Sequence, residues 1–180
     1  SPLGEVTVAA HQIAISITSQ LFMIPMSLAI ALTIRIGTYY GERNIIAMRK
    51  VQVLGLATGT ILALVSMSLL WFFRPEIVSF YTSDYDVTQI AVYLVLFAIA
   101  YQLMDSWQVS AAGCLRGMQD TKGPMWITML AYWVIAFPVG IYLARFTEMG
   151  AAGVWVGLIV GLSVACVLLL TRLYFNNQRL

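Results

Sequence analysis

The sequence predicts an all-α integral membrane protein with five transmembrane helices. Of its 180 residues, 61% are hydrophobic and only 10% are charged, and the mean hydropathy is +0.85. A soluble globular domain carries about 25% charged residues. The apolar segments are also long. A helix needs roughly 20 residues to cross a hydrocarbon core about 30 Å thick, and the shorter, alternating strands of a membrane β-barrel do not fit this pattern.

Prolines and glycines bound or bend the predicted helices. Pro25 lies inside the first span, where its missing N–H predicts a kink. The pair Arg74 and Pro75 is expected to end the second span, the Gly-Pro pair at 123–124 opens the fourth, and Pro138 interrupts it. The predicted spans are residues 8–37, 51–73, 87–116, 124–145 and 151–175.

Small and aromatic residues suggest how these spans pack. Gly55 and Gly59 in the second span, and Gly153, Gly157 and Gly161 in the fifth, are spaced four residues apart. Such ridges let two helix backbones approach closely, so we interpret them as structural. Five aromatic residues of the last two spans are either interfacial anchors or cavity walls: Trp126, Tyr132, Trp133, Phe137 and Trp155.

Basic residues gather in alternate connections. Eight lie at the ends of the first and third spans and in the C-terminal tail: Arg35, Arg43, Arg49, Lys50, Arg116, Lys122, Arg172 and Arg179. The other side holds only Arg74 and Arg145, together with five acids. Cytoplasmic loops are enriched in Lys and Arg, so this asymmetry predicts an external N-terminal end and a cytoplasmic C-terminus. Three apolar residues of the first basic loop are expected to enter the headgroup region: Ile45, Ile46 and Met48.

The first residues of the chain lack an initiator Met, and SPLGEVTVAA has no basic n-region or cleavage pattern of a signal peptide. An odd number of spans with an external N-terminal end is also unusual for a complete protein. We therefore expect the chain to start partway through a longer one, with a further helix upstream.

Asp105, near the middle of the third span, is the acid that lies deep inside an apolar run. An intramembrane carboxylate costs a few kcal/mol on insertion scales and usually faces a partner or a water-filled cavity. Helical spacing of three or four residues places Tyr101, Gln102, Gln108 and Val109 on its face. Carboxylate, phenol and amide oxygens are ligands that suit a hard cation. The alternative is a buried Asp satisfied by Ser or Tyr hydroxyls, with a role in packing.

Other chemistries lack support. There is no phosphate-binding loop, no nucleophile elbow and no H-E-x-x-H motif, and the basic residues are juxtamembrane and scattered rather than arranged for nucleic-acid binding. These features predict that the chain is not an enzyme and holds no cofactor. Cys114 and Cys166 are interpreted as small buried hydrophobes, and His11 as a structural polar group rather than a ligand.

Three stretches of the sequence are distinctive: AAHQIAISI in the first span, RIGTYYGERN followed by AMRK after it, and LRGMQDTKGPMW after the third span. They resemble the multidrug and toxic compound extrusion (MATE) family, in particular its NorM branch of bacterial efflux antiporters. The resemblance covers essentially the whole chain. It implies a twelve-helix protein of two six-helix lobes, in which residues 1–180 correspond to helices eight to twelve, most of the C-terminal lobe.

The resemblance also implies a function and a site. In the NorM branch, a coupling cation is bound by an acid and a tyrosine one turn apart on helix ten, which Asp105 and Tyr101 match, with Gln102 and Gln108 as candidate cavity-lining residues. The family site includes an acid on helix seven that this chain does not contain. The implied activity is export of cationic drugs against Na⁺ or H⁺ entry by alternating access, in the bacterial inner membrane. The implied partners are membrane lipid, the drug substrates and the remaining helices of the transporter.

Two further functions stay open at this stage. A flippase of lipid-linked precursors from the same superfamily would require a strongly basic cavity, and no span here carries an interior Lys or Arg. A non-transporting membrane scaffold would tolerate replacement of Asp105 by Asn without consequence.

Overall fold

The computed structural model describes residues 2–180, which form five membrane-length helices and contain no strand. The elements are α1 (Pro2–Gly41), α2 (Ile45–Ser79), α3 (Tyr85–Gly117), α4 (Lys122–Leu130), the π-helix η1 (Ala131–Ala136), α5 (Phe137–Phe146) and α6 (Ala151–Gln178). Because α4, η1 and α5 follow one another without a break, they make a single span. The predicted all-α membrane fold with five spans is confirmed.

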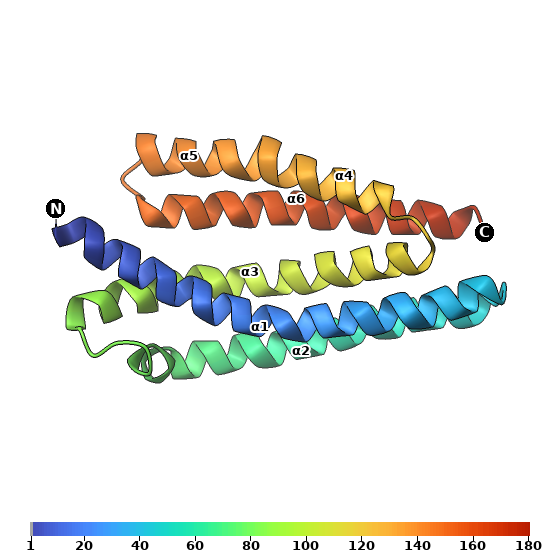
Figure 1. The fold of residues 1–180 in the computed structure, drawn as a ribbon, viewed down its shortest axis with the longest axis horizontal. Coiled ribbons are helices and arrows are strands. Elements are labelled where there is room, and N and C mark those ends of the chain that lie inside the picture. Colours follow the sequence, from blue (N-terminus) through green and yellow to red (C-terminus); the bar gives the residue numbers. More distant parts are fainter. Residues whose placement is uncertain (1) are drawn as a thin grey trace.

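Helix α3 is the centre of the bundle and packs against α1, α2 and α6. Its interior residues are buried on more than one side, as Val95 and Leu115 (each 0% exposed) illustrate. Figure 1 shows α1 and α2 side by side on one flank of α3, and the α4–α5 span lying along α6 on the other. The connections at 42–44 and 118–121 and the C-terminus lie at one end of the bundle, and the N-terminal end and the remaining two connections lie at the other (Figure 1).

The second span does not end where the sequence suggested. Helix α2 continues through Arg74 and Pro75 to Ser79, and the irregularity falls one residue earlier, at Phe73 (φ −109°, ψ 19°). Proline is disfavoured inside a helix because it lacks the N–H and collides with the preceding turn. Here the strain is absorbed by a kink, after which the last turns of α2 leave the axis of the helix (Figure 1). The prediction that Arg74-Pro75 stops the span is wrong.

The fourth span is interrupted before Pro138 rather than at it. Residues Ala131–Ala136 form a π-helix, and the N–H of Phe137 donates to the carbonyl of Tyr132, five residues back. Pro138 then stands in the first turn of α5, where a missing N–H costs little. The wider turn accommodates the proline ring, which would otherwise collide with a carbonyl of the preceding α-helical turn.

The glycine ridges act as predicted. A Cβ atom on Gly153 would lie 2.8 Å from the backbone N of Ala144, and one on Gly157 would lie 2.8 Å from the carbonyl oxygen of Ala136. Real Cβ atoms do not approach other atoms so closely. The backbones of α6 and the fourth span can therefore contact each other only because these positions of α6 are glycine. Gly59 of α2 similarly makes room for the hydroxyl of Ser106 on α3, 2.9 Å from an added Cβ.

The residues expected in the headgroup region divide into two kinds. Ile46 is 73% exposed at the end of the bundle, in agreement with the expectation, and Ile45 is half-buried. Met48 is 0% exposed and packs with Ile36 and Leu115, so the prediction is wrong for Met48. Asn44 accounts for this geometry: its side chain accepts from the N–H of Ala47 at 3.1 Å and starts α2 so that the next turn faces inward.

Candidate functional site

The ends of α3 determine where its polar residues lie. Asp84 caps the helix, since its carboxylate accepts from the N–H groups of Asp86 at 2.9 Å and Val87 at 3.1 Å. Between this cap and the turn at Met118, α3 continues without a break. Asp105 is therefore held midway along the most enclosed helix of the bundle, and it is only 4% exposed.

Asp105 lines a cleft of about 350 Å³ between three elements. Its walls are Thr18, Ser19 and Phe22 of α1, Tyr101, Asp105, Gln108 and Val109 of α3, and Tyr132 of η1. The structure thus brings Asp105, Tyr101 and Gln108 together at one cleft. It also adds hydroxyl groups from α1 and a second phenol from the π-helix.

The carboxylate of Asp105 has no hydrogen-bond or ion-pair partner within residues 2–180. Two nearby hydroxyls donate to other groups: Thr18 donates to the carbonyl of Ala14 at 2.8 Å, and Ser106 donates to the carbonyl of Gly59 at 2.9 Å. Buried polar groups are normally satisfied, and an unpaired one costs free energy. A packing role in which Ser or Tyr hydroxyls satisfy the carboxylate therefore has no counterpart in these contacts.

Gln102 lies between this site and the α2 side of α3. It is 7% exposed, and its amide oxygen is buried without a hydrogen-bond partner in the described part of the chain. Two small cavities of about 10 Å³ adjoin it: one shared with Tyr101, Asp105 and Pro25, the other with Gly59, Ser66 and Ser106. A cavity of this size holds about one water molecule. Gln102 therefore lines the edge of the site rather than the open cleft.

Tyr132 belongs to the site, although the sequence analysis left two interpretations open for it, an interfacial anchor or a cavity wall. It is half-buried, lines the cleft with Asp105, and its phenol interacts with that of Tyr101. Spacing along α3 cannot reveal a residue on another helix. The signal available in the sequence was Pro138, because a proline in a span predicts a disturbed turn just before it, and such π-helical turns are frequent at functional sites.

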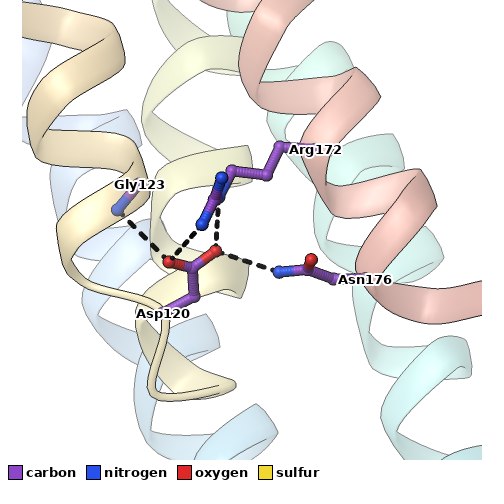
Figure 2. A network of polar contacts seen from close by, with 4 residues as sticks. All are labelled: Asp120, Gly123, Arg172 and Asn176. Atoms are coloured by element: carbon purple, nitrogen blue, oxygen red, sulfur yellow. Dashed lines mark hydrogen bonds and ion pairs between the residues drawn. The ribbon is translucent and has the colours of Figure 1, made fainter. Parts of the chain in front are cut away.

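A second polar cluster lies away from the cleft, at the C-terminal end of α6, and Figure 2 shows it. Asp120, in the connection between α3 and α4, accepts from Arg172 through Nε at 2.5 Å and Nη2 at 3.0 Å. It also accepts from Asn176 at 2.9 Å and from the N–H of Gly123 at 3.2 Å. These donors, Arg172 foremost, lower the pKa of the Asp120 carboxyl below its ordinary value.

The same end of the bundle is reinforced by Asn177. Its side-chain amide donates to Gln52 of α2 at 2.7 Å and accepts from it at 3.2 Å, and its carbonyl accepts from Arg49. Contacts of α6 with α2 and with the 118–121 connection therefore fix this end of the bundle. We refer to Asp120, Gly123, Arg172 and Asn176 as the end clamp.

These features together define a multi-pass membrane protein with a buried, unpaired carboxylate facing a cleft lined by oxygen-bearing side chains. The MatE family model matches residues 1–142. The chain is 73% identical, over its full length, to "Probable multidrug resistance protein NorM" of Acinetobacter baylyi, and 42% identical over 99% of its length to "Multidrug resistance protein MdtK" of Proteus mirabilis. The chain belongs to the MatE family, as the motifs of its first and third spans indicated.

The fold agrees with this assignment. The crystal structure of the eukaryotic MATE transporter AtDTX14 superposes on 99% of the chain with a TM-score of 0.92 at 20% sequence identity, and the match covers 41% of that structure. MATE transporters of this kind are 12-helix, two-lobed proteins, as the resemblance implied. The chain spans about 40% of the length of the curated relatives it matches.

Proposed function

We propose that this chain is most of the C-terminal lobe of a multidrug efflux transporter, helices eight to twelve, and that Asp105 binds the ion that drives export. The observation that carries the proposal is the carboxylate itself, 4% exposed and without a hydrogen-bond donor among residues 2–180, at the wall of a cleft of about 350 Å³. A group left unpaired in the membrane is suited to a ligand that arrives and leaves.

The surrounding oxygens suit a small monovalent cation or a proton. The carboxylate supplies the charge, while the phenols of Tyr101 and Tyr132 and the amide of Gln108 supply neutral oxygen atoms at the same cleft. In the family, an acid on helix seven completes the site. We propose that an upstream helix supplies it, which makes the cation site a joint property of this chain and the preceding part of the transporter.

Coupling follows from differential binding. A cation or proton on Asp105 neutralises the buried charge and stabilises the helix packing that holds it, whereas release favours the other packing. An ion shifts a conformational equilibrium only by the difference in its affinity for the two states. The kink in α2 and the π-helical segment of the fourth span are places where such repacking can occur with little disruption of helical hydrogen bonds.

The proposed transport is export of organic cations from the bacterial cytoplasm in exchange for Na⁺ or H⁺ entering across the inner membrane. The N-terminal end of this chain is proposed to face outward and the C-terminus to face the cytoplasm. Under this orientation the end clamp lies at the cytoplasmic surface. The lining of the Asp105 cleft favours a cationic over an anionic substrate, because it contains a carboxylate and no Lys or Arg.

The test uses the full-length transporter reconstituted in vesicles with ethidium as the transported cation. Imposed Na⁺ and pH gradients are applied separately, and ethidium movement is followed by fluorescence. We expect one gradient to drive ethidium transport in the parent protein and neither to drive it in Asp105→Asn. Transport by the parent that responds to neither gradient, or equal responses of parent and variant, would contradict the proposal.

A further inference from the structure

We infer that His11 is a positioning residue for the cation site: through Trp155 it holds the ring of Tyr101 beside Asp105. The inference rests on the proposed function, and it gives a role to the one histidine of the sequence, which the sequence analysis interpreted as purely structural.

The first step is a hydrogen bond between α1 and α6. The indole Nε1–H of Trp155 donates to Nδ1 of His11 at 3.2 Å, and the two rings meet edge to face with centroids 5.8 Å apart and an interplanar angle of 69°. Nδ1 is the acceptor of this bond, because an indole nitrogen can only donate. Trp155 is 2% exposed, so its ring is enclosed by the bundle.

The second step joins the same indole to the site. The ring of Trp155 packs edge to face against Tyr101, with centroids 6.5 Å apart and an interplanar angle of 84°. Among the ring–ring contacts of residues 2–180, this is the one that involves Tyr101, whose hydroxyl also interacts with that of Tyr132. Tyr101 lies one turn from Asp105 and shares its cleft. Three rings from α1, α6 and α3 therefore run from His11 to the edge of the site.

The physical reason for a positioning role is the buried indole donor. When its acceptor is removed, the N–H is left unpaired in an apolar setting, and the ring turns to regain a partner. Because the contact with Tyr101 is edge to face, its geometry depends on the orientation of the indole plane. A turned indole no longer supports the Tyr101 ring in its place beside the carboxylate, so ion binding weakens although Asp105 is untouched.

The experiment measures the coupling-ion concentration for half-maximal ethidium transport by the full-length transporter in vesicles, separately from the maximal rate. The variants are His11→Leu, which removes the acceptor, and Trp155→Phe, which removes the donor but keeps a ring. His11→Asn is the conservative variant, since its side-chain oxygen can occupy the position of Nδ1. Trp107→Phe is the matched control, because it removes an indole bond of the same kind, to Thr60 at 2.8 Å, on the other side of α3.

We expect His11→Leu and Trp155→Phe each to raise the half-maximal ion concentration about three- to tenfold. The change is modest because neither residue contacts the ion itself. The maximal rate should stay near the parent value. His11→Asn and Trp107→Phe should match the parent in both quantities, and the double variant His11→Leu with Trp155→Phe should be no worse than either single one. This non-additivity is the signature of one shared contact.

Additive effects of the two substitutions, or an unchanged half-maximal ion concentration in Trp155→Phe, would overturn the inference. If His11→Leu fails to insert, the comparison of Trp155→Phe with Trp107→Phe decides alone. Asp105→Asn in the same vesicles separates the two levels. If it abolishes coupled transport while the His11 and Trp155 variants behave as the parent, the positioning role is wrong and the proposed function stands. If it has no effect, the proposed function is wrong.

Discussion

Two aspartates associated with α3 have opposite surroundings. Asp105, in the middle of the helix, is 4% exposed and has no hydrogen-bond donor within the described chain, whereas Asp120, just beyond its end, accepts four hydrogen bonds although its side chain is 15% exposed. Burial normally demands more partners, not fewer. The contrast indicates that Asp120 stabilises the fold, and it is consistent with the proposed role of Asp105 in binding an ion.

The donors explain the difference. Arg172 and Asn176 stand one turn apart on α6 and reach Asp120 together, and Gly123 adds a backbone N–H (Figure 2). Among the described residues 2–180, no cationic side chain lines the cleft beside Asp105. A permanent cation there would pair with the carboxylate and compete with any transported ion, so the absence of Lys and Arg from that lining is consistent with the proposed role.

The largest expected effect is that substitutions of the two aspartates change different properties of the transporter. Asp105→Asn should abolish ion-coupled ethidium export by the full-length transporter while leaving membrane insertion and melting temperature near the parent values, since Asn keeps the size of the side chain but removes its charge. Asp120→Asn should retain export at matched protein level. Loss of coupling in Asp120→Asn, or ion-coupled export by Asp105→Asn, would reverse the comparison.

The next effect concerns the neutral oxygens of the site. Tyr101→Phe should weaken coupling less than Asp105→Asn, by about 1–2 kcal/mol, because it removes a neutral ligand oxygen. This corresponds to roughly a 5- to 30-fold higher half-maximal ion concentration. Tyr132→Phe should act in the same direction. Tyr142→Phe, on an exposed side chain of α5, is the matched control and should leave the ion dependence unchanged.

The end clamp should make the free energy of unfolding depend on pH. The donors around Asp120 lower its folded-state pKa, so its contribution to stability is present above the unfolded value of about 3.9 and is lost as the pH falls through the folded value. At pH 7, Asp120→Asn should lower the free energy of unfolding by about 1 kcal/mol, a value reduced by solvent at this partly exposed site.

The measurement is the melting temperature of parent and Asp120→Asn transporter in detergent at a series of pH values. The gap between the two proteins should be greatest near neutral pH and should close as the pH falls below the unfolded-state pKa of about 3.9 and through the lower folded-state pKa, where the parent carboxyl becomes protonated. A gap that stays constant down to the lowest pH would show that the clamp does not depend on the charge of Asp120.

The smallest perturbation tests which end of the bundle faces the cytoplasm, and so on which side of the membrane the end clamp with Asp120 lies. Cysteines introduced at Ile46, 73% exposed, and Tyr85, 75% exposed, lie at opposite ends, and the two native cysteines are buried. With an impermeant thiol reagent on intact cells, we expect Tyr85→Cys to react and Ile46→Cys to react only after the membrane is opened. The reverse pattern would place the end clamp outside and contradict the orientation inferred from the basic loops.

Much of the site could be predicted because it lies on one helix. The spacing of Tyr101, Asp105 and Gln108 along α3 is fixed by the helical repeat, so composition and periodicity were enough to place them on one cleft. Thr18 and Tyr132 depend on how helices distant in sequence pack, which no local pattern encodes. The same limit applies to the contacts of His11 and of the end clamp.

Two predictions made from local sequence patterns are wrong, one about a helix end and one about a side chain near a helix start. The Arg74-Pro75 pair predicted a stop, but the chain absorbs the proline by a kink at Phe73 and retains the remaining turns of α2. Met48 was expected at the lipid headgroups because it follows basic and apolar loop residues. The Asn44 cap starts the helix early and turns that side chain toward Ile36 instead.

The π-helix changes the rotational relation between the two halves of the fourth span. Tyr132 faces the cleft beside α3, while Gly140, about two turns later, faces Gly157 of α6. A uniform α-helix advances about 100° per residue, so the orientation of one residue dictates that of every other. A turn that holds an extra residue resets this angle between the two halves. The half before the π-helix can then face the Asp105 cleft, and the half after it can pack closely against α6, without the orientation of one half fixing that of the other.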